Sequence, residues 1–386
     1  IPGLDKVRPV LVLMGLLAFA FAVSNTRGPL YEKSLFFKAL VLFGGITVWS
    51  VPFSYYPGAS FDASLDFLKV VAGCFLIIKI ADSFRRIEKI IILINMVMVI
   101  FALDIGMKYL AGQDHGQIKG LVGGMFENPN DLSVNFVLFL PMPYYYFLVA
   151  KNTVLKLLSL AMFGLVLYGI VGCQSRGAML GATIVLGLLF LQTEKKGTAL
   201  VAGGLALMVV LTLAPESAFE RLKTVVTYKD ESSAYGRTLF YESSLRIMLS
   251  RPFTGVGIDA FQTAYAEDYR NPEDTSNRWP DPHSSYFQIM AELGVPGILT
   301  YLFMIYVSFR SLNRMAGDFK KRPECERRLH FVQCLRIGLV GFLFTTIFQS
   351  AGYVHTLYNM MALVVVLERV ETGNEAGRIH GTRYAG

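Results

Sequence analysis

The feature that most constrains this chain is the recurrence of apolar runs of about 20 residues along almost its whole length. A helix of that length crosses the hydrocarbon core of a bilayer. Because lipid offers no hydrogen-bonding partners, each span must satisfy its backbone internally, as a helix does. We therefore predict an all-α polytopic membrane protein with about 11–12 transmembrane helices. The eleven spans that we delimit are residues 8–23, 36–53, 64–81, 90–109, 132–149, 154–172, 178–191, 198–214, 285–309, 330–350 and 353–367.

The composition also favours a membrane protein. Hydrophobic residues make up 53% of the chain and charged residues 17%, against about 45–50% and about 25% in average soluble domains. These values exclude soluble globular and disordered proteins. The net charge of +7 lies in short loops, so we expect the lipid bilayer as a partner and no nucleic acid.

The basic residues of the loops predict the orientation, because positive charge favours the cytoplasmic side. The basic set comprises Arg27, Lys33, Lys38, Arg85, Arg86, Lys89, Lys151, Lys156, Lys195, Lys196, Arg310, Arg314, Lys320, Lys321, Arg322, Arg327, Arg328, Arg369, Arg378 and Arg383. Loops 110–131 and 215–284 then lie outside. Arg176, in the short loop 173–177, also lies outside and is an exception to the rule that basic residues lie inside. Ile1 also falls outside, and one more helix upstream would restore an even number of spans.

The segment 215–284 is a long polar loop, and loops of this length are often functional. We predict that it forms a small helical cap, with helices near 216–226 and 236–250 and a turn at 252–257. The predicted division of the chain is transmembrane helices in 1–214, the cap in 215–284, transmembrane helices in 285–367 and a cytoplasmic tail in 368–386.

His283 is the candidate general base. In the segment Asp281-Pro-His-Ser-Ser285, Asp281 is the expected helix cap, which places His283 in the first turn of the next span. The positive end of the helix dipole then keeps the imidazole neutral, as a base requires. Gly294 lies eleven residues later, within about 20° of the same helix face. The alternative is an interfacial histidine that only forms hydrogen bonds.

Two arginines are candidates for binding phosphate. Arg176 follows Ser175, the expected cap of the next helix, and a guanidinium there suits a phosphate or pyrophosphate. Arg237 shares a helix face with Tyr241, whereas Arg246 falls on the opposite side and is expected to be a surface charge. A snorkelling arginine at a helix end is the alternative for Arg176, and a solvated charge is the alternative for Arg237.

The turn Glu127-Asn-Pro-Asn-Asp131 precedes another outer helix. Asn128 and Asn130 could bind sugar hydroxyls, or the turn could simply cap the helix through Asn130 or Asp131.

Further patterns concern the structure rather than the chemistry. We expect ion pairs within the sets Asp66/Lys69 and Asp104/Lys108, and an interfacial aromatic belt at residues 144–146. Cys74, Cys173, Cys325 and Cys334 have neither metal-ligand spacing nor a shared polar loop, so free thiols are expected. The sequence contains no Walker, dinucleotide-binding, HExxH or Asp-x-Asp motif. We therefore expect no metal ion and no cofactor.

Four features resemble the O-antigen ligase/polymerase superfamily of bacterial envelope glycosyltransferases. They are the Asn128-Pro-Asn130 turn, the segment Ser175-Arg-Gly-Ala178, Gly236-Arg237 followed by Arg251-Pro-Phe-Thr-Gly-Val-Gly257, and His283 followed after ten residues by Gly294. The resemblance extends over most of the chain. Two departures are Tyr241, where the family often has tryptophan, and eleven spans rather than about twelve.

The resemblance implies an enzyme of the bacterial inner membrane with its active site facing the periplasm, in part on the cap. It would transfer an undecaprenyl-pyrophosphate-linked glycan to an acceptor hydroxyl, with lipid A core as the expected acceptor. His283 would be the general base, Arg176 and Arg237 would bind the pyrophosphate, and the reaction would be metal-independent and inverting. The remaining substrate-binding candidates are Asn128, Asn130 and Tyr241.

Three alternatives stay open from the sequence. A polymerase would use a second lipid-linked repeat as acceptor, and a protein O-oligosaccharyltransferase would use a side-chain hydroxyl. A flippase or other transporter of lipid-linked oligosaccharides would bind the same lipid without chemistry. Such transporters often contain repeated halves and broken helices, and no internal repeat is evident here.

Overall fold

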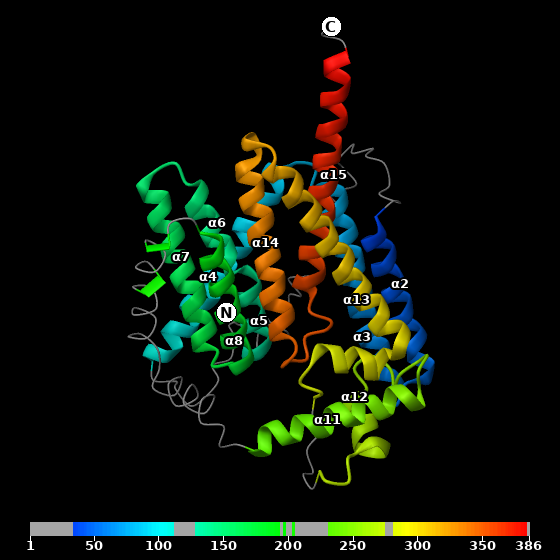
Figure 1. Ribbon diagram of the computed structural model, residues 1–386. Coiled ribbons are helices and arrows are strands. Elements are labelled where there is room, and N and C mark those ends of the chain that lie inside the picture. The colour runs from blue at the N-terminus through cyan, green and yellow to red at the C-terminus, as the bar shows by residue number, and fades with distance from the viewer. Residues whose placement is uncertain are drawn as a thin grey trace, which may run out of the picture.

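The computed structural model describes residues 34–111, 128–193, 196–197, 203–204, 231–274 and 281–383. Within these ranges the chain is helical and contains no strand, as predicted (Figure 1). The predicted span 8–23, almost all of 198–214 and the predicted helix 216–226 lie outside the described residues.

The long helices form one bundle. Their bounds are α2 Leu35–Ser50, α3 Pro57–Ile80, α4 Phe84–Leu110, α5 Pro129–Phe139, α6 Pro141–Val149, α7 Thr153–Gly172, α8 Arg176–Gln192, α13 Ser285–Lys320, α14 Glu326–Thr345 and α15 His355–Arg383. Six segments of the described chain are long and apolar enough to cross a membrane, and α8 is a shorter apolar helix. The protein is therefore a multi-pass membrane protein.

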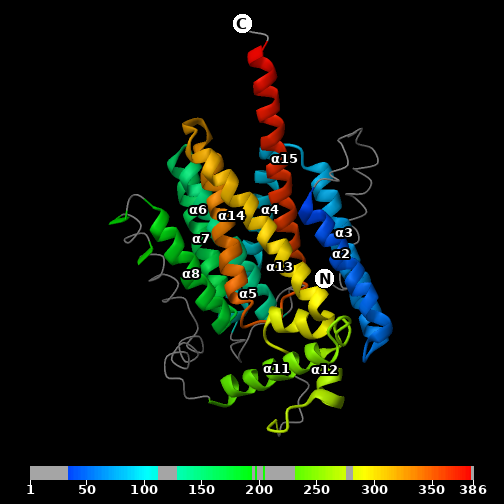
Figure 2. The same ribbon diagram turned by 45° about the vertical axis from the view of Figure 1, so that its right-hand side comes forward.

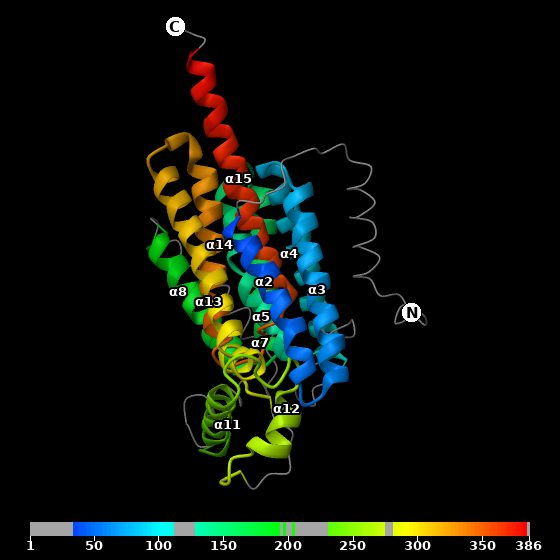
Figure 3. The ribbon, with the colours of Figure 1, turned by 90° about the vertical axis from the view of Figure 1, so that its right-hand side faces the viewer.

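Helix α14 lies inside the bundle, where it packs against α5, α6, α8 and α13. Small residues allow this close packing: a side chain at Gly338 would meet Leu138 O at 2.2 Å, and one at Gly341 would meet Val185 Cγ2 at 2.3 Å. On the other side, α13 packs along α2, and α15 packs against α3 (Figure 3).

The predicted span 132–149 is divided rather than continuous. Helix α5 ends at Phe139 and α6 begins at Pro141, with Leu140 between them. Pro141 has no N–H with which to continue the helical hydrogen bonds, and its ring crowds the preceding turn. The two helices still form a single apolar segment across the bundle.

The bundle has two chemically different ends. Helices α11 (Glu231–Ser250) and α12 (Phe261–Ala264) cover one end, and we call residues 231–274 the cap. The turns after α6 and α13 and the far end of α15 lie at the opposite end (Figures 1 and 2). These turns carry basic residues such as Lys151 and Lys320, so we call that end the basic side and the other the cap side. The separation agrees with the predicted alternation of loop charge.

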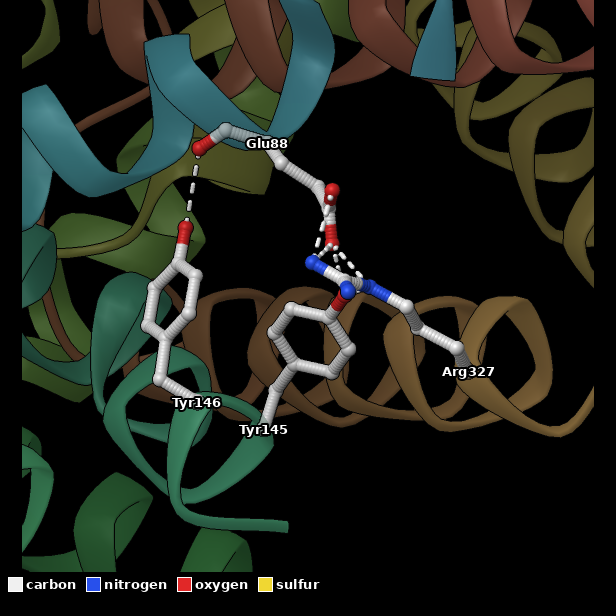
Figure 4. Close-up of polar contacts among 4 residues, drawn as sticks. All are labelled: Glu88, Tyr145, Tyr146 and Arg327. Carbon is white, nitrogen blue, oxygen red and sulfur yellow. Dashed lines mark hydrogen bonds and ion pairs between the residues drawn. The ribbon is translucent and has the colours of Figure 1, made fainter. Parts of the chain in front are cut away.

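A polar cluster near the basic side replaces the predicted aromatic belt (Figure 4). Tyr145 is fully buried, and its hydroxyl donates to the carboxylate of Glu88. Arg327 holds both oxygens of that carboxylate, with Nε to Oε1 at 2.9 Å and Nη2 to Oε2 at 3.1 Å. Tyr146 donates to the main-chain oxygen of Glu88 at 2.9 Å. The belt prediction is therefore wrong for Tyr145, because its hydroxyl finds a buried partner.

The predicted ion pairs and free thiols are confirmed. Lys69 pairs with Asp66 at 2.5 Å, and Lys108 pairs with Asp104 at 2.7 Å. All four cysteines are buried free thiols.

Candidate active site

Helix α11 of the cap carries Arg237 and Tyr241, both half-buried. The ring of Tyr241 stacks on that of Phe287 in α13, with centroids 4.2 Å apart and planes 8° from parallel. Its hydroxyl donates to Ile347 O at 3.4 Å. The stack fixes the helix that bears Arg237 against α13. Arg246 is an exposed charge beside Glu242 at 3.7 Å, as predicted.

His283 lies before α13 and not in its first turn, so that prediction is wrong. The helix begins at Ser285 with Ser284 as its cap residue. Asp281 does not cap the helix. Its Oδ1 instead accepts a hydrogen bond from Gln262 Nε2, in the segment 231–274, at 2.7 Å. His283 adopts a φ of 51°, in the left-handed region. The imidazole thus projects from a tight turn between the cap and the bundle.

The proposed shared helix face of His283 and Gly294 is also wrong, because α13 is broken at Gly294. This residue has φ 65° and ψ −161°, a conformation that is essentially restricted to glycine. The break leaves main-chain groups of α13 without helical partners. The turn after α11 supplies new ones: Val295 N donates to Pro252 O at 2.8 Å, and Val256 N donates to Ala291 O at 3.0 Å. Gly257 N donates to Glu292 O at 3.0 Å.

Glycines make this docking possible from both sides. A side chain at Gly294 would meet Pro252 O at 2.4 Å, and one at Gly255 would meet Glu292 O at 2.3 Å. Both glycines have positive φ. The segment from Arg251 to Gly257 therefore anchors the cap to α13 through main-chain contacts, which explains why glycine is needed at each position.

The surroundings of His283 lower the pKa of its imidazole, which favours the neutral form. The residue is exposed at the surface, yet the protein atoms around the ring lower its pKa by desolvation. The nearby guanidinium of Arg237 lowers the pKa further, and the carboxylate of Asp281 opposes both effects. The lowered pKa agrees in direction with the expected neutral imidazole, but its causes are desolvation and Arg237. The predicted helix dipole is not the cause, because His283 lies before the helix begins.

Arg176 is the first residue of α8 and is half-buried. Ser175 caps the helix as predicted, its Oγ accepting from Ala178 N at 3.5 Å. The same Oγ accepts from Gln349 Nε2 at 2.5 Å. Gln349 belongs to the α14–α15 loop (residues 346–354), so this loop holds the start of the helix that bears Arg176.

The cap of α5 is Asn128, so the prediction of Asn130 or Asp131 is wrong. Pro129 takes the first helical position, where its fixed φ is suited and its missing N–H costs nothing, and this places the cap one residue earlier. Asn128 accepts from Asn130 N at 3.0 Å, and Asn130 Oδ1 accepts from Gln349 at 3.4 Å. Part of each polar side chain is therefore engaged in structural contacts.

The structure brings Arg237 and His283 within electrostatic range of each other, with Tyr241 one turn further along α11. Asn130 and Ser175, the residue before Arg176, both contact Gln349 of the α14–α15 loop. The sequence analysis missed Gln349 and the contribution of Asp281. A polar side chain near the end of the predicted span 330–350 was a signal available for Gln349.

Comparison with protein families identifies part of the chain. A family model described as O-antigen ligase matches residues 145–302, from within α6 to within α13. The matched segment includes Arg176, Arg237, Tyr241 and His283. No curated protein matches the chain. Residues 145–302 are therefore identified as an O-antigen ligase domain within a multi-pass membrane protein.

Proposed function

We propose that the protein transfers a glycan from undecaprenyl pyrophosphate to an acceptor hydroxyl on the periplasmic side of the inner membrane, with lipid A core as acceptor. The observation that carries this proposal is the placement of His283 within electrostatic range of Arg237 at the cap side, where desolvation and the guanidinium lower the pKa of the imidazole. A base and a cation in one place match the two demands of the reaction, which are to remove a proton and to stabilise a leaving anion.

In the proposed reaction, His283 removes the proton of the acceptor hydroxyl as the oxygen attacks the anomeric carbon. The bond from that carbon to the pyrophosphate oxygen breaks, and the pyrophosphate leaves with the bonding electrons. Arg176 and Arg237 stabilise its negative charge. A single displacement inverts the anomeric centre. Because the arginines supply positive charge, we expect transfer without a metal ion.

The location of the site follows from the charges of the bundle. The basic side corresponds to the cytoplasm by the positive-inside rule, so the cap side faces the periplasm in this proposal. Lipid-linked glycans are amphiphilic, and the apolar helices beneath the cap offer the polyprenyl chain a path within the bilayer. Asn128, Asn130 and Tyr241 lie at this end and are proposed to contact sugar hydroxyls.

The test uses the purified protein in detergent with an undecaprenyl-pyrophosphate-linked glycan. Three acceptors are supplied in parallel: lipid A core, further donor lipid alone, and a hydroxyl-bearing peptide. A single glycan on lipid A core supports ligation, a ladder on the carrier indicates polymerisation, and a modified peptide indicates protein glycosylation. Absence of product with all three acceptors would favour a transporter, because detergent removes the two sides that transport requires.

Variants of histidine test the assignment of the base. We expect His283→Ala to lose at least about 100-fold in rate, the usual contribution of a general base. His330→Ala is the matched control, because His330 lies on α14, outside the proposed site, and pairs with Glu326 at 3.6 Å. Equal rates for His283→Ala and wild type would remove His283 from the mechanism. Loss of activity in EDTA with recovery in Mg²⁺ would refute a metal-free reaction.

A further inference from the structure

The α14–α15 loop, residues 346–354, contacts α5, α11, α13 and the start of α8, which carry or directly adjoin the proposed site residues. It lies outside the segment that matches the family model. Ser285 N of α13 donates to Thr346 O at 2.9 Å, and Tyr241 of the cap donates to Ile347 O at 3.4 Å. Three further hydrogen bonds of this loop, one each with α5, the start of α8 and α13, are made by one residue, Gln349.

Gln349 joins the starts of three helices. Its side-chain amide donates to Ser175 Oγ of α8 at 2.5 Å and to Asn130 Oδ1 of α5 at 3.4 Å. Its main-chain oxygen accepts from Ser285 Oγ of α13 at 2.9 Å. Only 7% of Gln349 is exposed, so water does not compete freely for these hydrogen bonds, and losing them leaves buried polar groups unsatisfied.

Packing around Gln349 reinforces the connection to α8. A side chain at Gly177 would meet Phe348 Cβ at 3.2 Å and Gln349 Cγ at 3.8 Å. The first turn of α8 therefore lies directly against the loop. On the α13 side, Ser285 Oγ also accepts from Ala351 N at 2.9 Å.

These contacts are close in sequence to the proposed chemistry. Arg176 directly follows Ser175, and His283 lies two residues before Ser285. His283 is therefore connected to Arg176 by the backbone and two hydrogen bonds. The first joins Ser285 to Gln349, and the second joins Gln349 to Ser175. Catalysis by a base and a cation requires a fixed separation between them, and a misplacement of about 1 Å can cost on the order of 100-fold in rate.

We propose that Gln349 is a positioning residue that sets the placement of Arg176 relative to His283. The proposal rests on the function proposed above, and it assigns no contact between Gln349 and substrate. The amide N–H groups are the essential feature, because both Ser175 Oγ and Asn130 Oδ1 accept from them. A glutamate at this position has the same shape but cannot donate to Asn130, and it places a negative charge near Arg176.

The experiment compares Gln349→Glu and Gln349→Ala with Thr356→Val. Thr356 of α15 donates to Asn135 of α5, so its variant also removes a hydrogen bond between two helices but leaves the starts of α8 and α13 untouched. We expect both Gln349 variants to lose about 10- to 100-fold in kcat with an unchanged KM for the acceptor. The kcat of Thr356→Val should stay within about twofold of the wild-type value, because the lost hydrogen bond does not involve the proposed site.

A double-mutant cycle shows whether Gln349 acts through α8. If it does, adding Gln349→Ala to Ser175→Ala lowers kcat little further than Ser175→Ala alone, because the contact is already lost. Amide hydrogen exchange in the first turn of α8 supplies a readout independent of activity. Ala178 and Met179 are the residues to follow, since their amides donate to Ser175. Their exchange should be faster in Gln349→Glu than in Thr356→Val.

Two results would overturn the positioning role. One is wild-type kcat in Gln349→Glu, and the other is unchanged exchange at Ala178 and Met179. Failure of the proposed function looks different, because wild type would then form no product or His283→Ala would stay fully active. The exchange measurement decides the placement of α8 in that case as well.

Discussion

At the scale of single residues, His283 shows how local geometry and charge combine. A non-glycine residue with φ 51° is unusual, and such conformations persist only where surrounding contacts hold them. Here the contacts are Asp281 held by Gln262 on one side and Ser285 held by the α14–α15 loop on the other. The turn directs the imidazole toward Arg237 and Phe240, whose ring centroid lies 6.3 Å from that of His283.

The opposed charges beside His283 predict opposite shifts in the pH profile of transfer. The base is active when neutral, so activity is lost as pH falls through its pKa. Arg237→Met removes a charge that lowers this pKa, and the acid limb of kcat should move to higher pH. Asp281→Asn removes a charge that raises it, and the acid limb should move to lower pH.

The measurement is kcat between about pH 4 and pH 9 for each variant, a range that brackets histidine. Arg246→Met is the matched control on the same helix, because Arg246 is exposed and lies beside Glu242. Its acid limb should coincide with that of wild type. Shifts of Arg237→Met and Asp281→Asn in the same direction would contradict the arrangement.

At the scale of elements, the break in α13 decides how the cap meets the bundle. The sequence predicts a continuous span because Gly294 stands within an apolar run, although Pro296 follows two residues later. The φ of 65° at Gly294 depends on the hydrogen bonds offered by residues 252–257, which are distant in sequence and were not visible in a local pattern. The cap thus completes a helix end that is otherwise unsatisfied.

Substitution at Gly294 tests this junction. Gly294→Ala should destabilise the protein by at least about 1–3 kcal/mol, because alanine is strained in that conformation and its Cβ would strike Pro252 O. Gly317→Ala in the same helix meets nothing within 4 Å and should be neutral or stabilising by up to about 1 kcal/mol. Thermal unfolding in detergent compares the two. Equal stability of both variants would mean that α13 does not need the break.

The stack of Tyr241 on Phe287 predicts the behaviour of the cap helix. Tyr241→Ala should increase proteolysis and amide exchange across α11, because an aromatic pair contributes about 0.5–1.5 kcal/mol beyond its buried area. Tyr241→Phe keeps the ring and serves as the control, losing only the hydroxyl contact with Ile347. If Tyr241→Ala exchanged no faster than Tyr241→Phe, the stack would not hold the cap.

At the scale of the whole molecule, the sequence predicts what depends on local composition. Apolar length and loop charge were sufficient for the six spans found among the described residues and for the separation of Lys151 and Lys320 from the cap. They could not reveal Gln349, whose importance comes from three helix starts meeting in space. Likewise, Tyr145 looked like a belt residue because its partners Glu88 and Arg327 are far away in sequence.

The polar cluster of Glu88, Tyr145 and Arg327 tests whether the basic side contributes to stability without affecting the proposed site at the cap side. Arg327→Met leaves the buried carboxylate of Glu88 without its guanidinium and should lower the thermal midpoint in detergent. Adding Glu88→Gln removes that charge, so the double variant should lose less stability than the sum of the single variants, by about 0.5–3 kcal/mol. The cluster lies near the basic side, away from His283. In the folded fraction of each variant, kcat should therefore fall at the same acidic pH as in the wild type.

Two results would contradict this account. Additive losses of stability would show that Glu88 and Arg327 do not act as a pair. A shift in the pH at which kcat falls would show that the two ends of the bundle are coupled.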